Sequence, residues 1–327
     1  MANLRVAAVV TAQDRRQFLP MAVRSAVEAG ADEVFVVRNF PGPIEGCEGQ
    51  YVDIPCDVPE TNEKEAQGLE RADSEIVAFL DDDDLWEPTK VRRLRTEFGE
   101  RPDLVYLCHA QRTIDAAGAA VTASHAEYAQ KAPERFGAWD GRHFGELVGR
   151  IWPGNNSSTC LRRSWARSWL PTFRAAGWGA DLFWLSAAYL DRQPMAMVPE
   201  PLTALRLHDQ NMSHQRDAGP AAFRSRHRTS CERFARSLEV LTRAAVDRRG
   251  PNDPGAVWLR AKSLSFRLLA DVEAGPGARR SAWRFLTDGS ASADRGATMA
   301  ALLALGSPAV ARRALYRSAL RRWRVDL

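Results

Sequence analysis

The first hundred residues of this chain alternate between segments typical of strands and segments typical of helices. Val6 to Val10 is a short β-branched run that predicts a buried strand. Further strands are predicted over residues 33–37, 51–54 and 75–80, and helices over 17–29, 63–72 and 89–98. This rhythm predicts an α/β fold with a mainly parallel sheet, right-handed crossovers and helices on its flanks.

The pattern changes towards the C-terminus. Strands are predicted over 104–108 and 157–162, a helix over 182–190, and a pair of strands over 195–198 and 202–207. Beyond about residue 218 the spacing is helical, over 222–246, 256–270 and 310–323. We therefore predict a first domain over residues 1–215 and a helical, arginine-rich region over residues 216–327.

The formal net charge of +4 hides an uneven distribution. Residues 1–100 carry 21 acidic and 11 basic side chains, whereas residues 215–327 carry 22 basic and 10 acidic ones. The hydrophobic share of 45% and the charged share of 26% exclude a disordered, collagenous or coiled-coil chain. An acidic front and a basic tail predict different partners for the two parts.

The cysteines and the apolar segments indicate a compartment. Five cysteines lie scattered without a CxxC pair, which favours a reducing environment. Only five apolar residues follow Arg5, too few for a signal peptide. The apolar stretch over 299–311 is interrupted and falls short of the ~20 residues that a spanning helix needs. We expect a cytoplasmic protein that meets a membrane, if at all, from the inner face.

Four consecutive aspartates, Asp81 to Asp84, directly follow a predicted strand. If the segment stays extended, Asp81 and Asp83 share one face. Neighbouring carboxylates repel each other, and a hard divalent cation that also binds substrate phosphates relieves that repulsion. The carboxyl edge of a parallel sheet is also where open α/β folds bind ligands. The run predicts a metal–phosphate site; a solvated acidic turn is the alternative.

Four segments resemble, in order, the motifs of family 2 glycosyltransferases of the GT-A fold. They read VVTAQDR at 9–15, DDDDLWEPTK at 81–90, ADLFWL at 180–185 and PEPLTALRLHDQNMS at 199–213. The resemblance spans roughly residues 4–214. It implies a nucleotide-diphosphate-sugar donor, an Mn²⁺ or Mg²⁺ ion, and inversion at the anomeric carbon.

The resemblance also implies roles for single residues. Asp181 would be the base that takes the proton from the acceptor hydroxyl, and Asp83 and His208 would hold the metal. Histidine suits Mn²⁺ better than Mg²⁺. The local alternatives are a helix N-cap for Asp181 and an ordinary strand-end histidine for His208. The donor contacts would come from Thr11, Ala12, Gln13, Arg15, Asn39, Gly68, Asp81 and Asp82.

Three departures from the family pattern leave the base and the sugar of the donor open. The second strand ends in Arg38-Asn39, where the family has an aspartate. Of the family's Arg-Asn-x-Gly only Gly68 is kept, and Ala180 stands where the family has a glutamate. These departures support an alternative, a catalytically silent GT-A scaffold that binds a sugar nucleotide or a partner.

A haloacid-dehalogenase-like phosphatase is a further alternative, because it also places Asp-x-Asp after a strand. That motif normally lies on the first strand and continues with Gly-Thr, whereas here about 80 residues precede it and Leu85-Trp86 follow.

The predicted helix over 310–323 has an apolar stripe and a basic stripe. The apolar stripe is Tyr316, Leu320 and Trp323, and the basic stripe is Arg313, Arg317, Arg321 and Arg324. Such a helix can lie on an anionic membrane and meet a lipid-linked acceptor, or pack against other helices or another copy of the chain. Nucleic acid is not an expected partner. The acceptor stays open among a glycan, a lipid-linked sugar and a small molecule, with a cell-surface glycan or glycolipid as the expected product.

Overall fold

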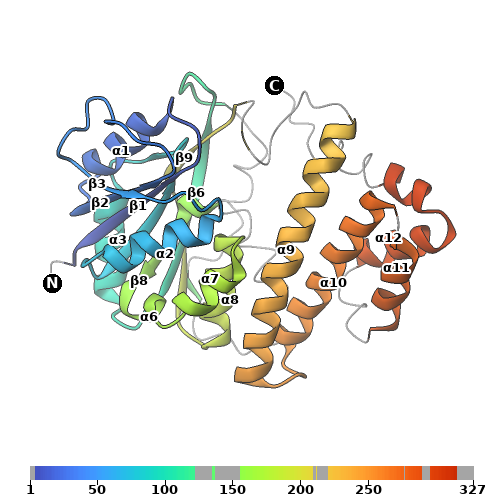
Figure 1. The fold of residues 1–327 in the computed structure, drawn as a ribbon. Helices are drawn as coiled ribbons and strands as arrows, with labels where there is room; N and C mark the ends of the chain where they lie inside the picture. The colour runs from blue at the N-terminus through green and yellow to red at the C-terminus, as the bar shows by residue number, and fades with distance from the viewer. Residues whose placement is uncertain are drawn as a thin grey trace. The chain divides into compact units, whose positions relative to one another are not determined.

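The computed structural model describes residues 4–121, 135–136, 155–208, 211, 220–275, 277–288 and 295–314. It divides into two compact units, Met1–Leu207 and His208–Leu327 (Figure 1). The predicted domain boundary after residue 215 lies outside the described residues.

The described part of the first unit holds one nine-stranded sheet. Its order is β3-β2-β1-β4-β8-β6-β9-β5, and β7 also pairs with β9. Strands β3, β2, β1 and β4 are parallel to one another, as are β6 and β9, whereas β8, β5 and β7 pair antiparallel. The predicted α/β fold with a mainly parallel sheet is therefore confirmed. The strands are β1 (Val6–Ala12), β2 (Glu33–Arg38), β3 (Val52–Pro55), β4 (Ile76–Asp81), β5 (Leu85–Trp86), β6 (Tyr106–Ile114), β7 (Arg135–Phe136), β8 (Thr159–Arg162) and β9 (Met195–Arg206).

The alternation of side chains along β1 and β4 separates two packed faces. On one face Val10 and Leu80 join a core with α1 (Leu19–Glu28) and α3 (Lys90–Glu100). On the other face Val9 meets α2 (Thr61–Arg71), where a side chain on Gly68 would collide with Val9. Asp81, the last residue of β4, lies on the same face of the sheet as Val9 and therefore points toward α2.

An aromatic layer lies on this second face. The Trp184 ring, on α8 (Ala180–Leu190), stacks on Phe79 of β4 with a centroid distance of 6.4 Å. Its other neighbours include Phe173, on α7 (Leu170–Ala176), at 4.4 Å, while α6 (Arg163–Arg167) precedes α7. Trp184 and Phe173 are fully buried, which fixes the start of α8 next to the end of β4.

The prediction of two paired strands over 195–198 and 202–207 is wrong. The segment forms one strand, β9, that runs parallel to β6. Its two prolines, Pro199 and Pro201, lie where the register with β6 is irregular. Proline has no N–H to donate to the neighbouring strand, and this loss is tolerated at an irregularity in the register. The prolines therefore interrupt the pairing without ending the strand. The strand predicted to begin at Ser157 begins at Thr159, because Asn156–Ser158 form a short 3₁₀ helix, η1.

The described part of the second unit is helical. It contains α9 (Pro220–Arg249), α10 (Pro254–Ala274), α11 (Ala278–Thr287) and α12 (Arg295–Gly306). Asp253 caps α10 by accepting from the backbone N–H groups of Gly255 and Ala256 at 2.9 and 3.2 Å. The helices predicted over 222–246 and 256–270 are confirmed; most of the one predicted over 310–323, with Arg317 and Arg321, lies outside the described residues. None of the described helices is long and apolar enough to cross a membrane.

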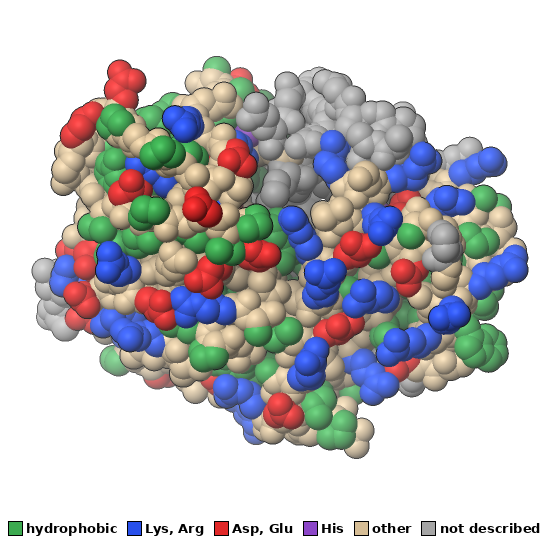
Figure 2. All heavy atoms as spheres, viewed as in Figure 1, with side chains coloured by type: hydrophobic (Ala, Val, Ile, Leu, Met, Phe, Trp, Pro, Cys, Tyr) green, Lys and Arg blue, Asp and Glu red, His purple; other side chains and the backbone are tan. Residues whose placement is uncertain are grey.

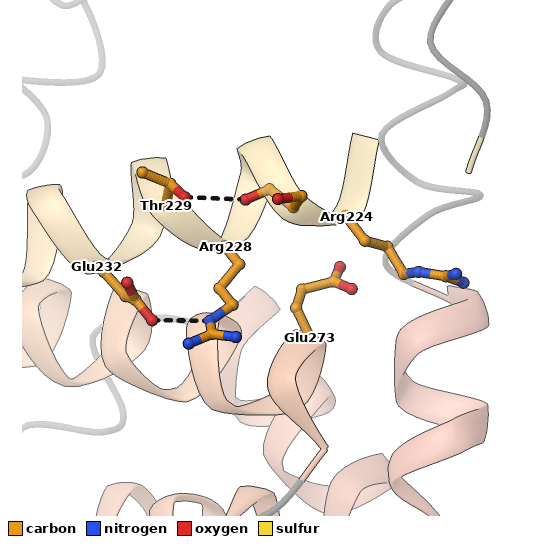
Figure 3. A pocket seen from close by; sticks show the side chains of 6 residues that line it. Arg224, Arg228, Thr229, Glu232 and Glu273 are labelled. Atoms are coloured by element: carbon orange, nitrogen blue, oxygen red, sulfur yellow. Dashed lines mark hydrogen bonds and ion pairs between the residues drawn. The ribbon is translucent and has the colours of Figure 1, made fainter. Parts of the chain in front are cut away.

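On the face drawn in Figure 2, Lys and Arg side chains are scattered over these helices with acidic side chains between them. One shallow pocket, of about 240 Å³, is lined by α9 and α10. In it Arg228 donates to Glu232 at 2.8 Å, and the buried Glu273 reaches in from α10 (Figure 3). Beside it, burial opposes protonation of His227, but contacts with Cys231 and Glu273 raise the pKa of His227 to about 10.

Candidate active site

The four aspartates form a turn at the end of β4, here called the aspartate turn (Asp81–Asp84). Asp82 and Asp83 are its corner, and the Asp84 N–H donates to the Asp81 carbonyl at 3.2 Å. The expected extended alternation of Asp81 and Asp83 is therefore wrong. Because Asp81 pairs with Thr11 of β1 in the parallel register, the turn lies at the carboxyl edge of the sheet.

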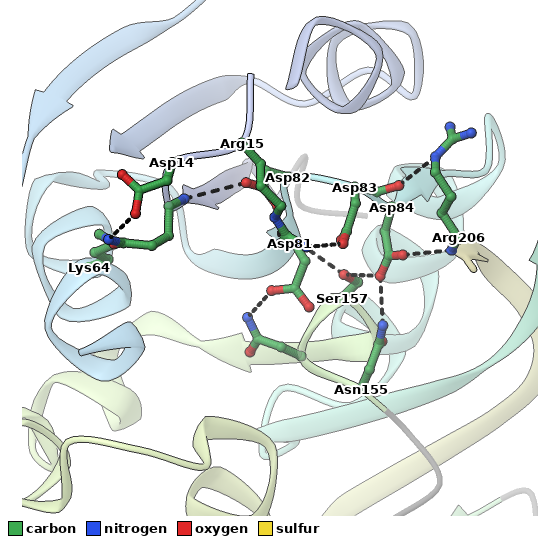
Figure 4. Close-up of polar contacts among 12 residues, drawn as sticks. Asp14, Arg15, Lys64, Asp81, Asp82, Asp83, Asp84, Asn155, Ser157 and Arg206 are labelled. Carbon is green, nitrogen blue, oxygen red and sulfur yellow. Dashed lines mark hydrogen bonds and ion pairs between the residues drawn. The ribbon is translucent and has the colours of Figure 1, made fainter. Parts of the chain in front are cut away.

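Arg15, in the loop after β1, binds two carboxylates of the turn. Its guanidinium donates to Asp83 at 2.6 Å and to Asp82 (Figure 4). The pKa of Asp82 is raised to about 7. Burial is the largest cause; Arg15 acts against it, and the neighbouring Asp83 and Asp81 add to it. One guanidinium therefore does not neutralise the negative charge collected at this turn.

Asp84 is the buried anchor of the turn. It accepts from Asn155 Nδ2 at 2.6 Å, Ser157 Oγ at 2.7 Å and the Arg206 N–H at 2.9 Å (Figure 4). Arg206 Nε in turn donates to the Asp83 carbonyl at 2.8 Å. Burial raises the pKa of Asp84 well above its ordinary value, and Asp83 and Asp81 raise it further. These bonds tie the turn to η1 and to the end of β9.

A buried lysine, Lys90, binds η1 and β9 next to the turn. Lys90 donates to the Ser157 carbonyl at 2.7 Å and to Thr203 Oγ1 at 3.3 Å, and its Nζ lies 4.4 Å from the centre of the Trp86 ring. Burial lowers its pKa to about 8. The anchoring roles of Lys90, Asn155 and Arg206 were not predicted. Only the polar run Asn155-Asn156-Ser157 carried a signal, because polar residues before a buried strand must find partners.

The loops after β1 and β2 meet beside the turn. Asp14 adopts a left-handed conformation with φ of 57°. Its N–H donates to Asn39 Oδ1 at 3.0 Å, and Asn39 Nδ2 donates back to Asp14 Oδ1 at 2.6 Å. The Gln13 N–H lies 3.4 Å from Asp82 Oδ2, and Lys64 of α2 donates to Gln13 Oε1. The structure thus brings together the predicted donor residues Gln13, Asn39 and Asp82.

The remaining predicted donor residues take part in packing. Thr11 and Ala12 are buried at the end of β1. Gly68 faces the sheet, and it allows α2 to approach Val9. Donor contacts for all eight predicted residues stay predictions.

Asp181 lies in the first turn of α8, beside the aspartate turn. The N-cap of this helix is Gly179, with φ of 77°, so the alternative that made Asp181 the cap is wrong. Its Oδ1 accepts from the Leu182 N–H at 2.8 Å. Burial raises its pKa to about 6, against the backbone N–H groups that lower it. The pKa of Asp81 is also raised to about 6. Burial and Asp83 are the larger causes, and Asp181 adds to them.

The pairing of His208 with Asp83 at a metal stays a prediction. His208 is the first residue of the second unit, and its N–H donates to Asn211 Oδ1 at 2.5 Å. Nowhere in the described ranges do three or more His, Cys, Asp or Glu side chains form a group that could hold a metal. Mg²⁺ commonly binds one or two carboxylates together with substrate phosphates, so the turn suits a cation that arrives with a ligand.

Comparison with known proteins finds a family model that matches part of the first unit. Residues 66–155 match the family model described as Glycosyl transferase family 2. This chain is a glycosyltransferase that is similar to family 2 over that segment. The matched segment contains the aspartate turn and extends to Asn155, one of the side chains that hold Asp84. No curated protein matches this glycosyltransferase.

Solved structures of another glycosyltransferase share its fold. S. aureus TarS, residues 1–349, superposes with a TM-score of 0.50 at 12% identity, over 97% of this chain and 92% of that one. The TarS 1–349 complex with UDP-GlcNAc gives a TM-score of 0.49 at 11% identity, over 85% and 88%. At such low identity the likeness concerns the fold alone, which is the predicted GT-A fold.

Proposed function

We propose that this glycosyltransferase moves a sugar from a nucleotide-diphosphate-sugar to an acceptor hydroxyl, with inversion at the anomeric carbon. The observation that carries the proposal is the packing of α8 on β4: Trp184 stacks on Phe79, so the first turn of α8 with Asp181 lies on the side of the sheet that Asp81 faces. Asp81 belongs to a turn that suits a diphosphate and its cation. Asp181 suits the removal of a proton, so a leaving-group site and a base lie close together.

Asp181 is the proposed general base. With a pKa of about 6 it is ionised at neutral pH, and it is still basic enough to accept a proton in the transition state. The Leu182 N–H fixes one of its oxygens. Asp181 takes the proton of the acceptor hydroxyl while that oxygen attacks the anomeric carbon opposite the leaving diphosphate. The attack from that face inverts the configuration.

Asp83 is the proposed ligand of Mn²⁺ or Mg²⁺, with His208 as its proposed partner. A bound cation supplies neutralisation of the charge that develops on the leaving diphosphate. Oxygen ligands suit both ions. Burial raises the pKa of Asp81 and Asp82, and the neighbouring carboxylates raise it further, a repulsion that a cation would relieve. Arg15 is a second positive group at this place, and its planar fork suits a phosphate.

The donor and acceptor follow from the same arrangement. We assign the nucleoside to the loops around Thr11, Gln13 and Asn39, and the diphosphate to Arg15 and the aspartate turn. The acceptor is a glycan, a lipid-linked sugar or a small molecule, and the product a cell-surface glycan or glycolipid. A cytoplasmic location, with membrane contact through the basic segment 310–323, belongs to this proposal.

Nucleotide binding tests the proposal. A panel of nucleoside diphosphates with Mn²⁺, including the UDP present in a TarS crystal structure, is added during thermal unfolding. A ligand at 100 times its Kd stabilises the folded state by about 2.7 kcal/mol. We expect stabilisation by at least one nucleotide, its loss in Asp83→Ala, and no change in Asp73→Ala, whose side chain is 81% exposed. Binding without any turnover would support the silent scaffold, and no binding at all would refute both interpretations.

A further inference from the structure

The buried side chains of Glu65 and Trp184 meet the partly buried Asn156 on the α2 side of the sheet, and each of the three has atoms without a standard hydrogen bond. These atoms are both carboxyl oxygens of Glu65, Oδ1 of Asn156 and Nε1 of Trp184. Glu65 and Trp184 are completely buried. The side chains of Trp184 and Asn156 are also the groups that act on Glu65 as hydrogen-bond partners. A buried polar group without a hydrogen-bond partner loses its full hydration free energy without compensation. We therefore expect these three side chains to bind one another.

The inventory of donors and acceptors selects one arrangement. An ionised Glu65 only accepts, so it can serve Trp184 Nε1–H but faces Asn156 Oδ1 as a second acceptor. A neutral carboxyl has one O–H donor and one carbonyl oxygen. Its O–H can donate to Asn156 Oδ1 while its carbonyl accepts from Trp184 Nε1–H. The neutral form therefore satisfies all three groups.

The orientation of the Asn156 amide is set from its other side. Asn156 Nδ2 donates to Asp81 Oδ1 at 3.2 Å. Turning the amide over would direct its oxygen at the Asp81 carboxylate, which is repulsive. With Nδ2 committed to Asp81, Oδ1 is the atom left for Glu65.

The charges around Glu65 favour the neutral form. Burial raises the pKa of Glu65 well above its ordinary value, and Asp81 of β4 and Asp181 of α8 raise it further. Five described cations of the neighbouring elements are engaged elsewhere. Arg15 binds Asp82 and Asp83, Lys64 binds Gln13, Arg38 of β2 binds Asp53, Arg163 of α6 lies 4.0 Å from Asp73, and Arg174 of α7 binds Glu63 and Glu70.

We propose that Glu65 is a positioning residue of this glycosyltransferase: as a neutral carboxyl it bridges Asn156 and Trp184, and it thereby holds the Asn156 amide toward Asp81. Trp184 lies one helical turn after Asp181 on α8. The bridge therefore connects α2 with the helix that carries the proposed base and with the side chain that orients Asp81. Its effect on turnover rests on the proposed function.

Two substitutions separate this role from simple packing. Glu65→Gln keeps one donor and one acceptor, whereas Glu65→Met keeps the volume and removes both. We expect Glu65→Gln to retain kcat/KM within ~2-fold of the wild type at neutral pH, and Glu65→Met to lose at least ~10-fold. In an Asn156→Ala background the further cost of Glu65→Met should fall to within ~2-fold, because the partner is already gone.

The pH profile supplies a readout that packing alone would not move. Wild-type kcat should decline at alkaline pH as Glu65 loses its proton, and this decline should be absent in Glu65→Gln, which cannot ionise. Equal damage from Gln and Met, an unchanged alkaline limb in Glu65→Gln, or a full Glu65→Met cost in the Asn156→Ala background would each overturn the proposal.

Infrared difference spectroscopy tests the bridge without turnover. Wild type minus Glu65→Gln at neutral pH should contain the carbonyl stretch of a protonated carboxyl group. If the band is present but no donor is turned over, the proposed function fails and the bridge stands. If transfer occurs but the band is absent, the bridge fails and the proposed function stands. This readout decides the matter even where Glu65→Met does not fold.

Discussion

The two units of this glycosyltransferase use charged side chains in opposite ways. In the first unit Arg206 is 1% exposed, and its backbone and guanidinium hold Asp84 and Asp83 in place. In the second unit the side chain of Arg228 is 51% exposed and pairs with Glu232 one turn away on the same helix. Buried charges of the first kind fix a geometry, whereas exposed pairs of the second kind contribute little. The charged groups of the two units therefore differ in how deeply they are buried, and the balance of charge along the sequence does not show this difference.

The largest effect is expected at Asp181. Asp181→Asn removes the proposed base with almost no change of shape, and we expect kcat to fall by about 10²–10⁴-fold. In the wild type the base must be ionised, so activity should decline as pH falls through the Asp181 pKa of about 6. Steady-state turnover from pH 5 to 9 measures both effects, and Asp73→Asn is the matched exposed control. Wild-type activity in Asp181→Asn would remove this residue from the mechanism.

The second effect concerns stability. Asp84→Ala deprives Asn155, Ser157 and the Arg206 N–H of their acceptor, and buried donors without partners are costly. We expect a loss of about 2–4 kcal/mol in the free energy of unfolding, measured by urea denaturation. Asp84→Asn, which keeps one acceptor oxygen, should lose less. A loss no larger than that of Asp73→Ala would mean that Asp84 anchors nothing.

The smallest effect is expected in the second unit. Arg228→Ala breaks the exposed pair with Glu232 and should change the free energy of unfolding by no more than about 0.5 kcal/mol. The same denaturation experiment measures it. A cost comparable to that of Asp84→Ala would show that the exposed charges of the helical unit also hold structure, and the contrast between the two units would not stand.

The sequence predicted most of the first sheet because its strands carry buried apolar runs, such as Val6 to Val10, between helices with apolar faces. It failed where tertiary contacts override local signals. The prolines of β9 indicated a break but lie at an irregular register, and the aspartates leave the strand after Asp81.

The candidate site was predictable only in part. The aspartates and Asp181 carry motif signals, and the stacking of Trp184 on Phe79 brings the start of α8 to the end of β4. The supporting groups do not carry such signals. Lys90 and Glu65 look like ordinary exposed positions of a charged helix, and only the packing of α2 and α3 on the sheet shows that both are buried. Their burial is a property of distant residues, which local periodicity does not contain.

Release of nucleoside diphosphate from a panel of nucleotide sugars, with Mn²⁺ and with Asp83→Ala beside the wild type, tests the central claim most directly. The account predicts that the wild type turns over at least one donor, and that Asp83→Ala loses at least ~100-fold of kcat/KM, about 2.7 kcal/mol of transition-state stabilisation. The unfolding temperature of the variant should stay that of the wild type. Equal turnover by both proteins, or no turnover of any donor by the wild type, would contradict the account.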